Sequence, residues 1–272
     1  PSPAEATAWV NSALSSRTSG GLSLIATDGE TFGHHHRQGV AVLQSLTQPN
    51  GRDTYRVTTL ARHLAAHPPT VDVRIREYSA WSCGHRLGRW TTGCACTPGC
   101  GHWKGALRRA LDNLSRDIDE VYTGVVRRRD VAPWRLRDDY ILVLMNQVSG
   151  TQFLNEHGLG HLSDEAQSQI LRLLNAQVHR QRMFVSCAFF FDDLERIEPR
   201  YAIANAVQAL ALTYYATGDD LTDAFRRDLG VTVSGRTGRS GIAILDDLMA
   251  QAQFGAGALG GDMSLSRPRH VA

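Results

Sequence analysis

The sequence has no long apolar run and no excess of one charge. No apolar stretch comes near the roughly 18 residues that a membrane-spanning helix needs, and no signal peptide opens the chain. The 29 basic and 27 acidic residues give a net charge of +2 and are mixed along the chain. Such mixing is typical of a solvated surface. We therefore expect neither nucleic acid nor a membrane among the partners.

Cysteine is scarce, with five residues in 272. Their odd number and uneven spacing favour reduced thiols in the cytoplasm over a secreted disulfide framework. Four of them form, with two histidines, a set large enough for a tetrahedral zinc site: Cys83, His85, Cys94, Cys96, Cys100 and His102. Structural zinc usually has about two to four residues between paired cysteines, whereas one residue separates Cys94 from Cys96. The spacing favours ordinary thiols, so we expect no metal and no cofactor, and Cys187 as a small buried residue.

The residues most typical of chemistry lie between Gly21 and Arg37. An apolar run of strand length, Leu22 to Ala26, leads into the turn Asp28-Gly29, and histidines follow at residues 34–36. In parallel α/β proteins, catalytic groups sit where a strand ends and a loop begins. Asp28 and Glu30 are therefore the first candidates, although Asp-Gly is also a common turn without chemistry. Because helical neighbours point roughly 100° apart, at most two of the histidines would serve one site.

The remaining pattern predicts an α/β start followed by a mainly helical part. Val71 to Ile75 alternates apolar and polar residues, as a half-exposed strand does. From Trp103 onward, apolar residues recur every three or four positions and predict successive helices, one capped by Ser163 and one stopped at Gly218. We expect an α/β unit over residues 1–78, a helical domain over 79–253 and an unfolded tail over 254–272.

Residues 79–103 form a segment of a different kind. They include three tryptophans, four cysteines, two histidines and five glycines, without a clean period. Such a composition is typical of a functional loop or clamp.

Three motifs occur in an order that resembles one group of proteins. They read Ala26-Thr-Asp-Gly-Glu-Thr-Phe-Gly-His-His-His, then Tyr78-Ser-Ala-Trp-Ser-Cys-Gly-His-Arg-Leu-Gly-Arg-Trp-Thr-Thr-Gly-Cys-Ala-Cys, then Phe184-Val-Ser-Cys-Ala-Phe-Phe-Phe-Asp-Asp. From about Gly21 to Thr217 the chain resembles the C-terminal half of glycoside hydrolase family 57 proteins that end in the helical domain of unknown function 3536. That group usually has Gly where this chain has Arg86, and Asp where it has Gly93.

The resemblance implies a retaining α-glycosidase or glucanotransferase acting on an oligo- or polysaccharide. The fold implied is an incomplete seven-stranded (β/α) barrel followed by helices, with residues 1–78 as its last strands. Asp28 would be the general acid/base, and the nucleophilic Glu would lie upstream of Pro1, in the missing half of the barrel. Retaining hydrolysis needs two carboxyl groups about 5 to 5.5 Å apart. We therefore expect the chain to be a fragment that is inactive alone.

The resemblance also implies sugar-binding residues around Asp28. Tryptophan faces cover the apolar side of a sugar ring, while His and Arg side chains hold its hydroxyl groups. The candidates are Glu30, His34, His35, Trp81, His85, Arg89 and Trp90. The alternative for both tryptophans is a packing role between barrel and bundle.

Two other function classes stay open. One is a metal-dependent hydrolase with a deacetylase-like barrel, in which Asp28 and His34 or His35 ligate an ion that activates water. The other is a non-catalytic helical module that binds carbohydrate or has a structural role. The residues do not specify the glycan, its linkage, or hydrolysis as against transfer.

Overall fold

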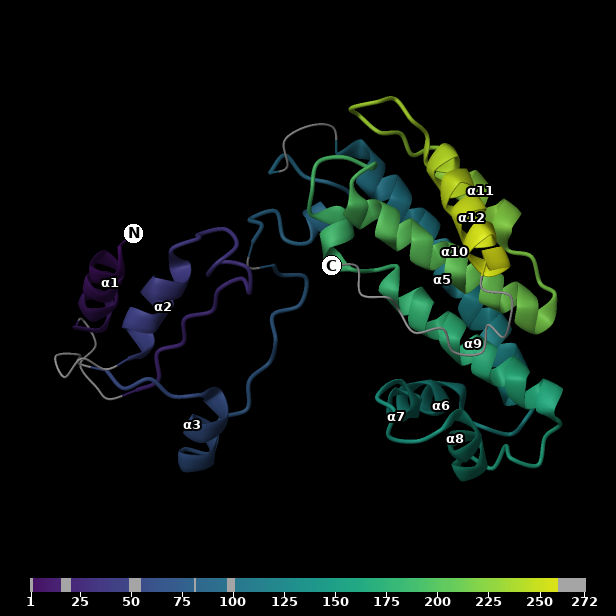
Figure 1. Cartoon of the computed structure of the whole chain (residues 1–272), viewed down its shortest axis with the longest axis horizontal. Coiled ribbons are helices and arrows are strands. Elements are labelled where there is room, and N and C mark those ends of the chain that lie inside the picture. The colour runs from purple at the N-terminus through teal and green to yellow at the C-terminus, as the bar shows by residue number, and fades with distance from the viewer. Residues whose placement is uncertain (1, 16–20, 49–54, 81, 97–100, 259–272) are drawn as a thin grey trace. The chain divides into compact units, whose positions relative to one another are not determined.

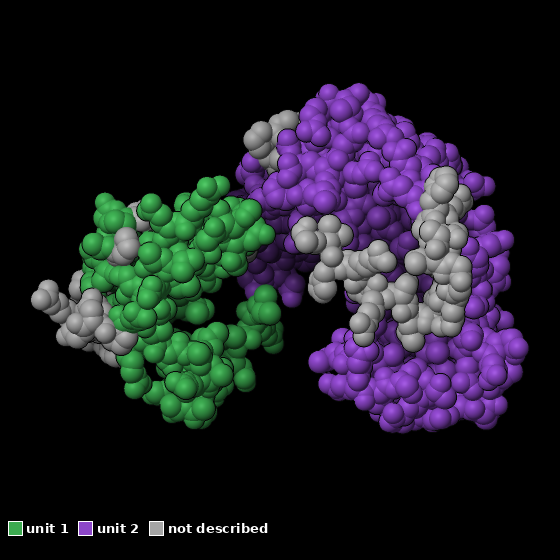
Figure 2. All heavy atoms as spheres, in the orientation of Figure 1, with its two compact units in different colours: residues 1–75 green, residues 76–272 purple. Residues whose placement is uncertain are grey.

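The structure, a computed structural model, describes residues 2–15, 21–48, 55–80, 82–96 and 101–258 (Figure 1). The chain divides into two units, residues 1–75 and residues 76–272 (Figure 2). The predicted boundary lay three residues further on, after residue 78. No helix among the described residues is long and apolar enough to cross a membrane.

Unit 1 contains three short helices, α1 (Pro3–Ser15), α2 (Gly39–Thr47) and α3 (Leu60–Ala66), within its described residues. Helices α1 and α2 pack against each other, and Val10 and Val42 are buried. Thr59 caps α3, because its side chain accepts a hydrogen bond from the Arg62 backbone N–H at 3.3 Å. Little else of the unit is enclosed.

The predicted strands are absent, and the expected α/β start with the last strands of an incomplete (β/α)7 barrel is wrong. The described residues hold no strand, only the isolated bridges Phe32–His36 and Val233–Ser240. Leu22–Ala26 and Val71–Ile75 run without regular structure. A strand satisfies its backbone N–H and C=O groups through a neighbouring strand, and no described segment pairs with either run. Their side chains stay exposed, with Val73 at 85%.

Unit 2 is helical, as the sequence predicts for this part. Its larger helices are α5 (His102–Arg127), α9 (Asp164–Arg182), α10 (Ile197–Thr217) and α12 (Gly241–Ala258). The short helix α4 (Gly88–Thr91) precedes them, and further short segments lie between them: α6 (Pro133–Asp139), α7 (Ile141–Leu144), α8 (Gly150–Glu156), the 3-10 helix η1 (Ser186–Phe189) and α11 (Thr222–Leu229). Helices α5, α9 and α10 pack on one another, and α11 and α12 pack on α5 and α10 respectively (Figure 1).

Two buried clusters hold the helices of unit 2 together. The larger joins the first half of α5 to η1, α10, α11 and α12, and includes Leu111, Phe189 and Phe225. The smaller joins the second half of α5 to α6, α8 and α9, and includes Tyr122. The amphipathic period of α5 explains this arrangement, since its buried residues recur every three or four positions.

The predicted helix ends are confirmed. The Ser163 side chain accepts a hydrogen bond from the Ala166 backbone N–H at 3.3 Å and caps α9. Gly218, at φ +82°, ends α10 in the left-handed conformation that glycine adopts most readily. Helix α12 continues to Ala258, into the segment predicted as an unfolded tail. Residues 259–272 of that tail lie outside the described part of the chain.

Candidate functional site

The turn that carries Asp28 is fixed by its own backbone. The Thr31 N–H donates to the Asp28 carbonyl at 3.0 Å, and the His35 N–H donates to the Glu30 carbonyl at 3.0 Å. The side chains of Asp28, Glu30, His34 and His35 are exposed. His35 Nε2 lies 3.6 Å from Glu30 Oε2, and the rings of His34 and His35 meet edge to face. The turn therefore holds one carboxyl group beside a histidine and presents the other to solvent.

The turn does not gather a metal site. Among the described residues, no group of three or more histidine, cysteine or acidic ligands includes Asp28, His34 or His35. The metal-dependent hydrolase that we kept as an alternative needs such a group to hold its ion. The geometry gives it no support.

The other predicted sugar-binding residues, from Trp81 to Trp90, belong to unit 2. Two of their side chains point into the protein. Trp81 lies outside the described residues. The Arg89 side chain is buried, with its guanidinium carbon 4.4 Å from the centre of the Phe190 ring. Trp90 packs partly buried against the larger cluster, and its Nε1 is enclosed. Both side chains therefore take part in packing, which for Trp90 is the alternative role named above.

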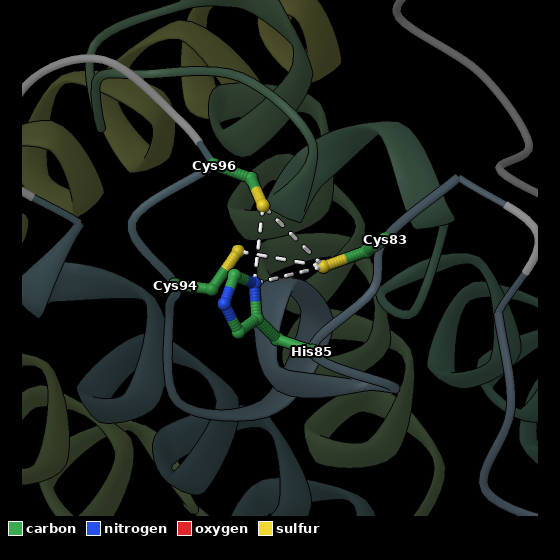
Figure 3. A group of neighbouring side chains, drawn as sticks. All are labelled: Cys83, His85, Cys94 and Cys96. Atoms are coloured by element: carbon green, nitrogen blue, oxygen red, sulfur yellow. Dashed lines mark hydrogen bonds between the residues drawn. The ribbon is translucent and has the colours of Figure 1, made fainter.

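His85 joins a compact group with Cys83, Cys94 and Cys96 (Figure 3). The four ligand atoms all lie within 4.8 Å of one another. Cys83 Sγ lies 3.6 Å from Cys94 Sγ, 3.9 Å from Cys96 Sγ and 3.8 Å from His85 Nδ1. His85 Nδ1 lies 3.1 Å from Cys96 Sγ. We call these four residues the sulfur cluster.

Two loops on either side of α4 bring the sulfur cluster together. Cys83 and His85 precede the helix, and Cys94 and Cys96 follow it. Gly93 turns the chain back at φ +90°, and a Cβ there would lie 2.7 Å from the Gly101 carbonyl oxygen. This close approach requires glycine at a position where the resembling group usually has Asp.

Arg86 adopts a conformation that suits the glycine of the resembling group. Its φ is +59°, in the left-handed region. A side chain costs energy there, which glycine avoids. The backbone of this loop is therefore the one that the group's glycine would favour, although this chain carries arginine.

Charge around the sulfur cluster is unevenly distributed. Burial opposes ionisation of Cys94, but hydrogen bonds from the Cys96 backbone and from the Cys83 and Arg89 side chains outweigh it and lower the pKa of Cys94 to about 7. Burial and the neighbouring sulfurs raise the pKa of Cys96. The cluster thus favours the ionised form of Cys94 and disfavours that of Cys96.

A buried lysine lies next to this cluster. Lys104, the single lysine of the chain, stands in the first turn of α5 with none of its surface exposed. Burial, followed by the charge of Arg89, lowers the pKa of Lys104, while Cys94 and Asp192 act in the opposite direction. We did not single out Lys104 from the sequence. Its uniqueness in a chain with 29 basic residues was the available signal.

Three further candidates for metal or thiol chemistry stand apart. Cys100 lies outside the described residues. His102 is exposed at the start of α5. Cys187 is exposed in η1, which corrects its expected burial, because the short helix directs Ala188 and Phe189 inward instead.

Comparison with known proteins identifies one family. The family model described as a domain of unknown function, DUF3536, matches residues 101–267. No curated protein and no solved structure matches the chain. The matched range begins at the N-terminal end of α5 and covers the helical bundle of unit 2.

Proposed function

Because the chain belongs to the DUF3536 family, we propose that it is part of a carbohydrate-active enzyme of the glycoside hydrolase family 57 type. In this proposal Asp28 is the general acid/base, and Glu30, His34 and His35 contact hydroxyl groups of an α-glucan-like substrate. A reducing compartment such as the cytoplasm is expected, since Cys83 and Cys94 lie close as free thiols.

The observation that supports this proposal best is the arrangement of the acid turn. Glu30 lies beside His35, whereas Asp28 is exposed two residues earlier on a backbone fixed by hydrogen bonds. A carboxyl group that is open to solvent on a hydrogen-bonded turn can transfer a proton to a bound glycoside.

A second carboxyl group must come from elsewhere. In retaining hydrolysis one carboxylate attacks the sugar while the other protonates the leaving oxygen, from about 5 to 5.5 Å away. Glu30 belongs to the same short turn as Asp28, so it is poorly placed for the opposite face of the sugar. We propose that additional polypeptide of the same protein supplies the nucleophile, and that the 272-residue chain is inactive alone.

The test compares the 272-residue chain with the longest polypeptide encoded in the same reading frame. The release of new reducing ends from maltooligosaccharides is measured for both. We expect turnover only by the longer polypeptide. Asp28→Asn in it should lower kcat by about 10²- to 10⁴-fold, the usual contribution of a general acid/base.

Asp72→Asn is the matched control, because Asp72 is another exposed acid of unit 1. Turnover by the 272-residue chain alone would contradict the need for a second carboxyl group. Unchanged turnover after Asp28→Asn would exclude Asp28 as the acid.

A non-catalytic role of unit 2 is the second candidate. The inward packing of Arg89 and Trp90 favours it, since neither side chain is presented as a sugar-binding surface. On this view the helical bundle is structural. Glycan binding by the 272-residue chain that survives Asp28→Asn and is lost with Trp90→Ala would contradict the structural role and indicate a carbohydrate-binding module instead.

A further inference from the structure

We propose that Cys83, His85, Cys94 and Cys96 bind one zinc ion. Three thiolates and one imidazole form a ligand set that is common in structural zinc sites. The inference is independent of the proposed glycosidase function, since the sulfur cluster contains none of the residues of the acid turn.

The distances fit a tetrahedral ion. Zinc binds sulfur at about 2.3 Å and nitrogen at about 2.0 Å, so ligands at tetrahedral angles lie about 3.8 Å apart for two sulfurs and about 3.5 Å apart for sulfur and nitrogen. The two measured sulfur–sulfur separations are 3.6 and 3.9 Å. Two of the three sulfur–nitrogen separations are 3.8 and 3.1 Å. The two remaining pairs, Cys94 with Cys96 and Cys94 with His85, lie within 4.8 Å. The side chains converge on a common centre (Figure 3).

Other uses of these thiols fit less well. A disulfide requires sulfurs about 2.05 Å apart, while Cys83 and Cys94 are separated by 3.6 Å. Iron–sulfur clusters are usually held by four cysteines, and magnesium and calcium prefer oxygen ligands. A site with three sulfurs and one imidazole nitrogen therefore favours zinc.

The charge around the cluster also suits a loaded site. A zinc ion with three thiolates and a neutral imidazole carries a single net negative charge. Arg89, 8% exposed, and Lys104, fully buried, both interact electrostatically with Cys94. Of the four ligands only Cys83 is buried, so the anion is partly open to water. Nearby cations stabilise such a charge by Coulomb attraction.

Four protein ligands leave no open position on the ion, so its role is structural. The two ligand loops flank α4, and α4 packs on α5 and η1. A Cβ on Gly105 of α5 would lie 3.3 Å from the Thr92 Cα, which shows how closely the end of α4 approaches α5. The ion would fasten residues 83–96 to the helical bundle, and metal binding would contribute to folding.

The usual spacing of about two to four residues between paired zinc-binding cysteines does not predict this site. It assumes that each cysteine pair forms a zinc knuckle of its own. Here each loop supplies two ligands separated by one residue, and the turns at Arg86 and Gly93 bring the loops together.

The experiment measures zinc and cobalt binding by the reduced 272-residue chain. After loading with zinc and gel filtration, we expect one zinc ion per chain by elemental analysis. Cobalt should give the d–d bands of a tetrahedral ion together with sulfur-to-cobalt charge transfer. Charge transfer separates this site from binding to exposed histidines such as His34 and His35, which offer no sulfur.

Two ligand variants and one control sharpen the test. Cys83→Ser and His85→Ala should each weaken zinc binding by at least about 100-fold, since even outer-shell partners of a metal are worth about 10- to 100-fold. Replacing the buried Cys83 side chain can also impair folding. His85 is exposed, so its replacement tests zinc ligation separately from folding. Cys187→Ser, which removes an exposed cysteine outside the cluster, should bind zinc as the wild type does.

Chelation gives a second readout. Removal of zinc should lower the thermal midpoint of the wild type and of Cys187→Ser but leave that of His85→Ala unchanged. Binding of less than one equivalent without sulfur charge transfer would overturn the proposal. Equal zinc affinity in the wild type and His85→Ala would exclude His85 as a ligand.

Discussion

Apolar side chains of unit 2 gather into two buried clusters, whereas many of those in unit 1 lie in solvent. Leu107, Leu111 and Ile118 of α5 are fully buried. In unit 1, Leu24 is 66% exposed and Ile75 is 84% exposed. Both units contain apolar residues in regular patterns, so hydrophobicity alone does not explain the difference.

For the extended runs of unit 1, the backbone explains it. A helix satisfies its own hydrogen bonds, so an amphipathic helix needs only another apolar surface to become part of a core. An extended run needs a neighbouring strand as well. Unit 2 consists of helices, and the apolar surfaces on which they pack belong to other helices of the same unit. The extended runs of unit 1 find no neighbour among the described residues.

The largest expected effect comes from removing a buried side chain of unit 2. Leu111→Ala should lower the free energy of unfolding by about 2–5 kcal/mol, because the truncation leaves a cavity in the larger cluster. The matched control is Leu64→Ala in α3, where the side chain is exposed. It should cost less than about 1 kcal/mol, since helix propensity changes little between Leu and Ala.

Urea unfolding followed by circular dichroism checks both variants. Equal losses would contradict the contrast between the units, because they would mean that Leu64 is as well enclosed as Leu111.

A buried acid of unit 2 provides the next test. Asp193 is buried and accepts hydrogen bonds from the Ser234 hydroxyl at 2.9 Å, the Glu195 N–H at 2.9 Å and the Arg236 N–H at 3.1 Å. Burial acts to raise the pKa of Asp193, but these bonds outweigh it and lower that pKa below the usual value of an aspartic acid. Asp193→Asn should cost about 1.5–3 kcal/mol at pH 7, the range for hydrogen bonds to a charged group.

The cost should depend on pH in a defined direction. A carboxyl group with a lowered pKa in the folded state stabilises the protein above its unfolded pKa of about 3.9. That contribution is lost as the pH falls through the folded pKa of Asp193, so the variant and the wild type should begin to converge below about pH 3.9 and should meet below the folded pKa. Asp192→Asn, at an exposed neighbour, is the control. A difference that persists unchanged at low pH would show that the Asp193 charge does not contribute.

The helical half of the fold was predictable because its signals are local. The period of α5, the Ser163 cap and the glycine at 218 each act within a few residues. The strand predictions failed because pairing is not a local signal. Alternation in Val71–Ile75 shows that a segment suits a sheet, but it does not show that a neighbouring strand is present.

The same distinction between local and distant signals applies to the candidate site. Turn formation at Asp28 follows from its own Asp-Gly sequence, and the structure has that turn. The sulfur cluster depends instead on the meeting of two loops, which spacing along one loop does not encode. The inward orientation of Arg89 likewise depends on Phe190, about a hundred residues later in the chain.

The smallest expected effect concerns the exposed run of unit 1. Val73→Asp in the 272-residue chain should change the free energy of unfolding by no more than about 0.5 kcal/mol, as is usual for surface substitutions. In the longer polypeptide of the proposed enzyme the same substitution should cost several times more, because additional chain that covers the run would bury the carboxylate. Urea unfolding of both polypeptides measures the two values. A large loss in the 272-residue chain would mean that Val73 is already covered there, and equal small losses would mean that the run stays exposed in the longer protein.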